Sequence, residues 1–567
     1  MSATVLQILK VLLLCLWSVS ATSDVDWWES ATLYQIYPRS FMDSNGDGVG
    51  DLNGITSRLE FLKEIGITAA WLSPIYKSPM ADMGYDVANF TDIDPLFGTL
   101  KDFDALIAKA HELDLKIILD FVPNHSSDEC EWFQKSVLRE DGYDDFYIWE
   151  DGKVDPVTGE RKPPSNWNSV FNGPMWTWNE QRQQYYLNQF LPKQPDFNFT
   201  NPQLRKKLIE VMRFWLDRGV DAFRIDAVPH FREMRFENGT YPDEFVSGFT
   251  NDTNHYQYYT HIYTKDQPEN VELLYEWREF LDEYQRLHGG ETRAMIAEAY
   301  SPVEVLSTYI NNGTHVGSQV PMNFNFIPLN NQVTAEHVEY MAKNWMDVMW
   351  PRHKMANWVV GNHDNSRPAT RLGWQRRDIM TIIAHALPGT SVTYYGDEIG
   401  MPDMNTECTP SNCDFRDPVR TPMQWDASKN AGFSAGNSTW LPVNPNYKQL
   451  NVQAQRGIAR STLQIFKSMT ALKKTAAFKA FKKEGGFSFG ALSKQVFQIV
   501  RTDAKREEYR VLANFGSQFE YFDGLTNKTM EYVILTSYSP HRIGERVDLS
   551  KRILLMPYEA VVLRWAA

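Results

Sequence analysis

The segment Ala222-Phe223-Arg224-Ile225-Asp226-Ala227-Val228 has the pattern of a buried β-strand that carries two charges. It follows Gly219, and apolar residues flank both charged positions. Arg224 and Asp226 are two residues apart, so in a strand they lie on the same face. An ionised carboxylate in such a strand costs several kcal/mol unless it is paired or functional. The segment therefore indicates either a structural ion pair or a carboxylate that an arginine holds at the mouth of a barrel.

Seven further apolar segments of strand length accompany this one, with helical patterns between them. The eight predicted strands are 33–37, 69–72, 117–122, 220–225, 294–297, 322–326, 356–360 and 390–394. Helical patterns include 54–65, 100–113 and 202–218, the last with Asn201 as N-cap and Pro202 in its first turn. Eight strands that alternate with helices predict a (β/α)8 TIM barrel.

Two regions depart from this repeat. Residues 125–200 follow the third strand, are rich in Trp, Pro, Gly and Asn, and predict a small domain inserted at the barrel mouth. From 483 to 567 the pattern changes to short alternating runs, which predict a C-terminal antiparallel β domain. The barrel is then expected over 24–124 and 201–482.

Composition limits the classes of partner. The formal net charge of the 567 residues is −14, which argues against nucleic acid or an anionic membrane as a partner. A hydrophobic content of 43% is ample for globular cores. The 18 Trp and 26 Tyr suit cores and also surfaces that stack sugar rings, and composition does not separate these uses.

The first residues predict export from the cell. Lys10, the apolar run 11–17 and the small residues 18–23 form a signal peptide over 1–23. That run is too short to span a bilayer, and no later uncharged apolar stretch of about 18 residues follows. We therefore expect a secreted protein without a transmembrane anchor.

Cysteines and glycosylation sequons fit the same expectation. An oxidising compartment favours a disulfide between Cys408 and Cys413 and leaves Cys130 as a buried thiol. Asn124 begins a sequon but lies in a polar motif discussed next. The predicted N-glycosylation sites are Asn89, Asn198, Asn238, Asn251, Asn312, Asn437 and Asn527.

Polar motifs end five of the predicted strands. Functional residues of barrels lie at the carboxyl ends of the strands. One such residue is usually a turn or cap, but five strand ends with carboxylates and histidines favour a shared site. The motifs are Val122-Pro123-Asn124-His125, Phe223-Arg224-Ile225-Asp226, Ile296-Ala297-Glu298-Ala299, Gly361-Asn362-His363-Asp364 and Tyr395-Gly396-Asp397-Glu398.

The first four motifs resemble, in this order, the conserved regions of the α-amylase family of glycoside hydrolases. The resemblance runs from about residue 27 to the C-terminus and includes Gly84-Tyr85-Asp86. Gln194-Pro195-Asp196-Phe197-Asn198 and the segment 416–425, RDPVRTPMQW, are similar to the oligo-1,6-glucosidase and maltase branch of that family.

This resemblance implies a retaining mechanism. Asp226 would be the nucleophile, Glu298 the general acid and base, and Asp364 the residue that stabilises the transition state. Such a reaction needs one ionised and one protonated carboxyl about 5 Å apart. Arg224 would keep Asp226 ionised by lowering its pKa.

The resemblance also implies contacts with a terminal glucose. For Tyr85 and Phe171, packing in the core is an equal alternative. Ala227 is small, as in α-1,4-specific members, where a valine accompanies α-1,6 preference. The implied substrate-binding residues are Asp86, His125 and His363 for the hydroxyls, Tyr85 and Phe171 for the ring, Arg416 and Arg420 to close the site, and Arg224.

A loop after the first strand has the composition of a cation site. The segment 43–51, DSNGDGVGD, places oxygen side chains at alternate positions between glycines. Hard oxygen ligands suit Ca²⁺, and the alternative is an Asx-turn loop with solvated charges. Related enzymes imply a structural Ca²⁺ held by Asp43, Asn45, Asp47, the Val49 carbonyl and Asp51.

Three functions follow from these residues. The first is an exo-acting α-glucosidase that acts on maltose, sucrose and short maltooligosaccharides. The second is a secreted receptor or binding protein on the same scaffold, and the third is a transglycosylase or sucrose isomerase. Because Asp226, Glu298 and Asp364 are all present, an enzyme is favoured over a binding protein.

Overall fold

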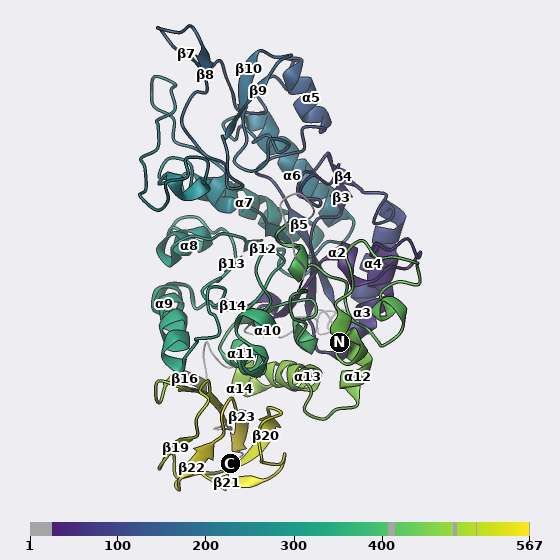
Figure 1. Ribbon diagram of the computed structural model, residues 1–567, viewed down its shortest axis with the longest axis vertical. Coiled ribbons are helices and arrows are strands. Elements are labelled where there is room, and N and C mark those ends of the chain that lie inside the picture. Colours follow the sequence, from purple (N-terminus) through teal and green to yellow (C-terminus); the bar gives the residue numbers. More distant parts are fainter. Residues whose placement is uncertain (1–24, 406–413, 480–484, 506, 566–567) are drawn as a thin grey trace, which may run out of the picture.

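The computed structural model describes residues 25–405, 414–479, 485–505 and 507–565, and a parallel barrel forms its centre (Figure 1). The barrel strands are β1 (Thr32–Ile36), β2 (Ala69–Leu72), β5 (Lys116–Phe121), β11 (Ala222–Ile225), β12 (Ala294–Ala297), β13 (Val320–Pro321), β14 (Asn357–Val359) and β15 (Thr390–Tyr394). They pair in parallel in the order β13-β12-β11-β5-β2-β1-β15-β14. The predicted (β/α)8 barrel is confirmed.

Helices connect the strands, and the N-cap predicted at Asn201 is confirmed. The Asn201 side chain accepts hydrogen bonds from the backbone N–H groups of Gln203 and Leu204 and so caps α6, as predicted. The helices are α2 (Pro38–Phe41), α3 (Leu52–Glu64), α4 (Leu100–Glu112), α5 (Glu131–Val137), α6 (Pro202–Asp217), α7 (Asn270–His288), α8 (Val303–Ile310), α9 (Ala335–His353), α10 (Pro368–Arg371), α11 (Trp374–Ala386), α12 (Val452–Arg456), α13 (Thr462–Lys473) and α14 (Ala476–Lys479).

The predicted position of the sixth strand, 322–326, is wrong. The strand is β13, which consists of two residues that precede this range. Pro321 has no N–H to donate to a ladder. Hydrogen bonds from a side chain replace the ladder at this point. The Asn357 amide donates to the Pro321 carbonyl at 2.7 Å and accepts from the Asn323 N–H at 2.7 Å. These bonds join β13 to β14 at the seam of the barrel.

The insertion between β5 and α6 forms its own small sheets. They are the antiparallel sheet β6 (Trp149–Glu150), β10 (Gln184–Leu187) and β9 (Trp176–Asn179), and the pair β7 (Lys153–Val154) and β8 (Arg161–Lys162). Tyr241, which follows β11, completes their apolar cluster. Bridges from His125 to Asp196 and from Tyr147 to Phe197 pair the first part of the insertion with its last residues.

The C-terminal strands form an antiparallel sheet at the other end of the molecule from the insertion (Figure 1). They are β16 (Gly485–Ala491), β17 (Val496–Asp503), β18 (Glu508–Asn514), β23 (Ala560–Trp565), β20 (Thr529–Leu535) and β21 (Arg546–Asp548), with a separate pair β19 (Glu520–Phe522) and β22 (Ile553–Leu555). The predicted antiparallel β domain is confirmed.

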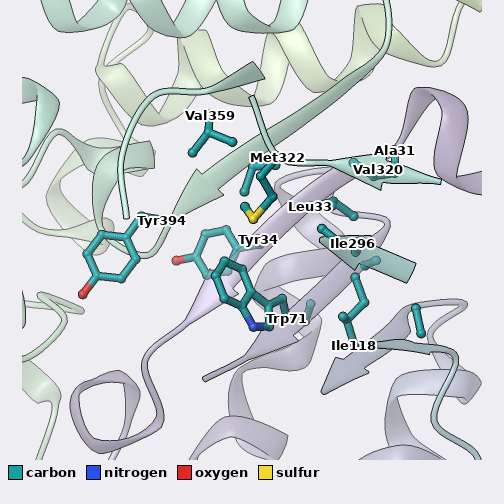
Figure 2. Close-up of a cluster of buried hydrophobic side chains, with 14 of the residues drawn as sticks. Ala31, Leu33, Tyr34, Trp71, Ile118, Ile296, Val320, Met322, Val359 and Tyr394 are labelled. Atoms are coloured by element: carbon teal, nitrogen blue, oxygen red, sulfur yellow. The ribbon is translucent and has the colours of Figure 1, made fainter. Parts of the chain in front are cut away.

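The barrel is filled by side chains, so it is a core and not a channel (Figure 2). The labelled side chains come from strands all around the barrel, and all of them are buried. They are Leu33, Tyr34, Trp71, Ile118, Ile296, Val320, Val359 and Tyr394, with Ala31 and Met322 beside them. This rigid floor positions the residues that follow each strand.

Candidate active site

The carboxyl ends of the barrel strands surround one cavity of about 320 Å³. Asp226, Glu298 and Asp364 all line it, and they follow β11, β12 and β14. Parallel strands of a barrel end on one face, which brings together residues that are far apart in the chain. Six of the residues implied for substrate binding share this wall: Tyr85, His125, Phe171, Arg224, His363 and Arg416.

Arg224 is the centre of one charged network in this cavity. Its Nη1 donates to Asp120 Oδ1 at 2.8 Å and also to Asp226 Oδ1. Its Nη2 lies 3.7 Å from Glu298 Oε2. The guanidinium is 4% exposed and lies over the Trp71 ring, 4.9 Å from the centroid. One buried positive charge therefore faces three carboxyl groups.

Burial and charge act in opposite directions on this network. Burial raises the pKa of Asp226 well above its usual value, Arg224 lowers it, and Glu298 and Asp120 raise it again. Burial likewise raises the pKa of Asp120 to about 6 against the effect of Arg224. Arg224 thus acts on Asp226 in the expected direction but does not outweigh burial. Asp226 and Asp120, which share one guanidinium, retain a proton more readily than isolated carboxyl groups.

Asp364 has a contrasting environment with more than one positive charge. Arg420 Nη2 donates to its Oδ1 at 3.0 Å, and Arg416 Nη1 lies 3.5 Å from the same oxygen. Burial opposes ionisation, but His363 and the two arginines outweigh it and lower the pKa of Asp364 to about 2. Burial lowers the pKa of His363 to about 3, so near neutral pH the arginines carry this effect. Asp364 is therefore an ionised carboxylate.

Tyr85 and His125 belong to the wall and to the core at once. The Tyr85 ring is 7% exposed and stacks on the His363 ring, with centroids 5.4 Å apart and planes at 1°. Its hydroxyl donates to Asp120 Oδ2 at 3.0 Å. His125 Nε2 lies 3.2 Å from the Tyr85 carbonyl and 3.0 Å from Gln194 Nε2, and burial lowers the pKa of His125 to about 3. Tyr85 therefore packs in the core and also lines the cavity, and its contact with a sugar ring stays a prediction.

Asp86 does not line the cavity. It lies in the loop between β3 (Tyr76–Lys77) and β4 (Asn89–Ile93) and is fully buried. Its oxygens accept hydrogen bonds from the Ser78 hydroxyl at 3.0 Å and from the Ala81 N–H at 2.8 Å. Its side chain therefore shapes the loop and does not reach a ligand in the cavity.

Asp82, which the sequence reasoning missed, occupies the wall in its place. Its Oδ1 accepts from Arg416 Nη2 at 2.8 Å, and its Oδ2 accepts from Gln194 Nε2 at 3.1 Å. Gln194 opens the segment 194–198, so this contact gives that segment a physical role. The sequence did place Asp82 near the motif, three residues before Tyr85. Asp86 is equally near, and only the conformation of the loop shows that Asp82 is the aspartate that lines the cavity.

Of the last two residues implied for substrate binding, Phe171 lines the cavity and Arg420 does not. Arg420 is 1% exposed and does not line the cavity, and its Nε donates to the His363 carbonyl at 2.9 Å. It binds the Asp364 carboxylate through its Nη2 without lining the cavity itself. Phe171 lines the cavity, and the Arg416 guanidinium lies 5.3 Å from its ring centroid. Further wall residues lie just outside the motifs or in loops without one: Phe190, His230, Lys265, Tyr300, Asn365 and Phe415. Tyr300 and Asn365 directly follow two of the strand-end motifs.

Residues 35–482 match the family model described as the catalytic domain of alpha amylase. The chain belongs to the α-amylase family. It is 61% identical over 559 residues to Maltase A2 of Drosophila melanogaster, with 99% of each chain covered. It is 44% identical to a salivary alpha-glucosidase of Aedes aegypti, over 88% of this chain and 87% of that one.

A solved structure agrees with this assignment to the α-amylase family. The trehalulose synthase MutB from Pseudomonas mesoacidophila MX-45 aligns with a TM-score of 0.82 at 27% identity, over 95% of this chain and 99% of that chain. As a member of the α-amylase family, the chain is a glycoside hydrolase, which the four strand-end motifs predicted.

In the loop 43–51 of this α-amylase family member, backbone N–H groups donate hydrogen bonds to the side-chain oxygens. Asp43 accepts from the N–H groups of Asn45, Gly46 and Gly48 at 3.0, 2.7 and 2.8 Å. Asp51 caps α3 by accepting from the Gly54 N–H. Across the described ranges, no group of three or more His, Cys, Asp or Glu is placed to hold a metal ion. Carboxylate and amide oxygens are suitable ligands for Ca²⁺. A carboxylate has about four acceptor sites, so these hydrogen bonds do not use up the oxygens of the loop. Ca²⁺ at this loop stays a prediction.

The remaining sequence predictions concern the surface and the cysteines. Cys130 is buried and free, as predicted, whereas Cys408, Cys413 and the predicted signal peptide 1–23 lie outside the described residues. Asn124 is buried, and Asn198 is partly exposed. Within the part of the chain that the structure describes, no helix has the length and apolar character to cross a membrane. The other predicted glycosylation sites are exposed: Asn89, Asn238, Asn251, Asn312, Asn437 and Asn527.

Proposed function

We propose that this chain is an exo-acting, retaining α-glucosidase that releases terminal α-1,4-linked glucose from maltose, sucrose and short maltooligosaccharides. The observation that carries the proposal is the arrangement of Asp226, Glu298 and Asp364 around one cavity, with Arg224 between the first two. The names maltase and alpha-glucosidase among the relatives support the same reaction.

The reaction takes two steps. Asp226 attacks the anomeric carbon while Glu298 protonates the glycosidic oxygen, so that a covalent glucosyl-enzyme forms and the second sugar leaves. Glu298 then takes a proton from water, whose oxygen displaces Asp226 from the glucose. Asp364, which is ionised, accepts hydrogen bonds from the sugar hydroxyls and stabilises the positive charge of the transition state.

The wall of the cavity supports action on a chain end. The Asp82–Arg416 ion pair and the His125 ring line the cavity with the three carboxylates. Charged and polar groups in a cavity of about 320 Å³ can satisfy the hydroxyls of one terminal glucose. A long polysaccharide chain would need an open cleft that continues beyond these groups.

Ala227 supports a preference for α-1,4 bonds. It lies in the wall beside Asp226, its φ is +54°, and its N–H donates to Glu298 Oε2 at 2.8 Å. A β-branched residue is strained at positive φ and would add methyl groups between the nucleophile and the acid. A difference of this size biases a choice of substrate by about 1–3 kcal/mol.

The deciding experiment measures hydrolysis of maltose, sucrose, isomaltose and starch by the wild type and by Asp226→Asn. We expect rapid release of glucose from maltose and sucrose, slow action on isomaltose and starch, and loss of activity in Asp226→Asn with an unchanged circular dichroism spectrum. Identical behaviour of the two proteins would instead support a binding protein. Conversion of sucrose to an isomer would support the isomerase alternative, which the structural similarity to a trehalulose synthase favours. Faster action on isomaltose than on maltose would contradict the role of Ala227.

We also infer secretion and a structural Ca²⁺. The predicted signal peptide 1–23 and the exposed sequons support secretion, as does the similarity to a salivary alpha-glucosidase. The oxygen donors of the loop 43–51 support Ca²⁺.

A further inference from the structure

A second cavity, of about 860 Å³, is lined by the insertion and by loops of the barrel. The strands β6 and β10 of the insertion supply Trp149 and Gln184 to its lining. On the barrel side, the lining includes residues 231–235, which follow β11, and residues 267–269, which precede α7. The volume lies within the range of about 300–1,000 Å³ that is usual for ligand sites. None of the three carboxylates of the candidate active site lines it, so the two cavities are distinct.

Asn198, near the end of the insertion, lines this cavity and begins the sequon Asn198-Phe199-Thr200. Its Oδ1 accepts from the Thr200 N–H at 3.2 Å and from the Thr200 hydroxyl at 2.6 Å. Its Nδ2 donates to the Asp145 carbonyl at 3.0 Å. An asparagine amide nitrogen carries two hydrogens, so one of them remains for replacement by a sugar. Three hydrogen bonds therefore hold an attachment point at the edge of the cavity.

The cavity lining suits a sugar chain, because it combines apolar surface with hydrogen-bonding groups. Met234 is 40% exposed, and Trp149 is partly exposed. Such side chains suit the C–H faces and the acetyl methyl group of N-acetylglucosamine, the sugar that is joined to asparagine. Burial raises the pKa of Glu233 to about 8, so near neutral pH its carboxyl group keeps a proton. That group can then both donate and accept hydrogen bonds, as sugar hydroxyls do.

An exposed ion pair joins the two sides of this cavity. Arg235 Nη2 donates to Glu150 Oε1 at 2.6 Å, and the Arg235 side chain is 52% exposed. Exposed ion pairs contribute little to stability, because solvent screens them. A covalently attached sugar chain in the cavity would add contacts with both sides, and it would not lose the translational entropy that a free ligand loses.

We propose that Asn198 carries an N-linked glycan whose first sugars fill this cavity and join the insertion to the barrel. In this modification Nδ2 loses a proton and bonds to the anomeric carbon of N-acetylglucosamine. The donor is an oligosaccharide on a lipid diphosphate, and the diphosphate is the leaving group. The inference rests on the secretion proposed above and not on the catalytic mechanism.

The first test measures how fast the glycan is released from the folded protein. Protein secreted by insect cells is treated with a peptide-N-glycosidase, and peptide mass spectrometry follows the conversion of each glycosylated asparagine to aspartate. We expect release at Asn198 to be slower than at Asn238 on the order of tenfold, because the cavity must open first. Asn238 is the matched control, since it is exposed and its Oδ1 accepts the same two hydrogen bonds from Thr240. Denatured protein should lose both glycans at the same rate.

The second test measures the melting temperature with and without the glycan. Asn198→Gln removes the glycan and also the amide hydrogen bonds, so the wild type and the variant are also made in bacteria, where neither is glycosylated. The fall in melting temperature should be larger for the insect-cell pair than for the bacterial pair by on the order of 1–2 °C. Asn238→Gln should show no such difference between the two hosts.

Each other outcome has a defined meaning. An unmodified Asn198 beside modified sequons elsewhere overturns the inference and leaves secretion intact. Equal release at Asn198 and Asn238 in the folded protein, or equal falls in the two hosts, also overturns it, because the glycan would then lie outside the cavity. If no sequon is modified, the proposed secretion fails and the inference falls with it. Hydrolysis of maltose is measured separately and decides the proposed α-glucosidase function alone.

Discussion

At the scale of single residues, the neighbouring arginines give the carboxyl groups of the site different pKa values. Arg224 faces Asp226, Asp120 and Glu298 together, so one charge is shared and burial still raises the pKa of Asp226. Asp364 instead has two arginines, and its pKa falls to about 2. The count of positive charges around each carboxylate, and not its residue type, separates the two environments.

The first prediction concerns Arg420→Met. Asp364 has a lowered pKa, so it is ionised at all pH values above about 2 and protonates only below that. Loss of the Arg420 guanidinium raises that pKa, so Asp364 protonates at a higher pH. The acidic limb of the kcat/KM profile, which also reports Asp226, then becomes steeper and moves to higher pH. The measurement is kcat/KM for maltose across the acidic and neutral range. Arg286→Met, at an exposed arginine on α7, controls for the loss of a positive charge. An acidic limb that keeps both its position and its slope would contradict this role of Arg420.

At the scale of elements, the loops after the strands decide which side chains reach the cavity. The loop between β3 and β4 turns Asp82 inward and uses Asp86 for its own hydrogen bonds. The loop 43–51 before α3 curls around Asp43 in the same manner. In both loops a buried aspartate organises the backbone. The exposed Asp47 is therefore a better probe of bound cations than Asp43.

The second prediction concerns Ca²⁺ in the loop 43–51. A cation that binds only the folded state adds about 2.7 kcal/mol of stability at a concentration of 100 times its Kd. We expect a chelator to lower the melting temperature of the wild type and added Ca²⁺ to restore it. Asp47→Ala should be insensitive to the chelator, whereas Asp141→Ala, at another exposed aspartate, should respond like the wild type. A wild type without any response would support the Asx-turn alternative.

At the scale of the whole molecule, the barrel and the C-terminal sheet share one core. Apolar residues of β17 and β18 belong to the same buried cluster as the barrel. Arg501 is buried and donates to the carbonyls of Ala386 at 3.2 Å and Ala477 at 3.3 Å, which joins β17 to α11 and α14. Arg376 Nε donates to the Phe515 carbonyl at 3.0 Å. The C-terminal sheet thus packs against the outer helices of the barrel, including α11 and α14.

The third prediction follows from this shared core. The barrel and the C-terminal sheet should unfold in one calorimetric transition, because separation would expose apolar surface on both and break the hydrogen bonds of Arg501 to α11 and α14. A chain truncated before residue 485 should be insoluble for the same reason. Two well-separated transitions, or a soluble truncated chain with glucosidase activity, would contradict a common core.

The sequence alone determined the fold class and the set of candidate carboxylates. The alternation of strands and helices predicts the barrel because each period reports which face of an element is buried. The strand-end motifs predict that Asp226, Glu298 and Asp364 meet, since all strands of a parallel barrel end on one face. Asn201 as the cap of α6 was readable for a similar reason, because a cap depends on its nearest neighbours in the chain.

Only the tertiary structure decided between candidates within a loop or across a seam. Asp82 and Asp86 have the same side chain four residues apart, and the contacts of Asp82 with Arg416 and Gln194 select it for the cavity. The two-residue β13 depends on the Asn357 side chain from a neighbouring strand. Tyr300 directly follows the motif 296–299, but its position depends on Phe324 and two asparagines. Local patterns record periodicity and capping, whereas these features depend on partners distant in sequence, which only the folded chain brings into contact.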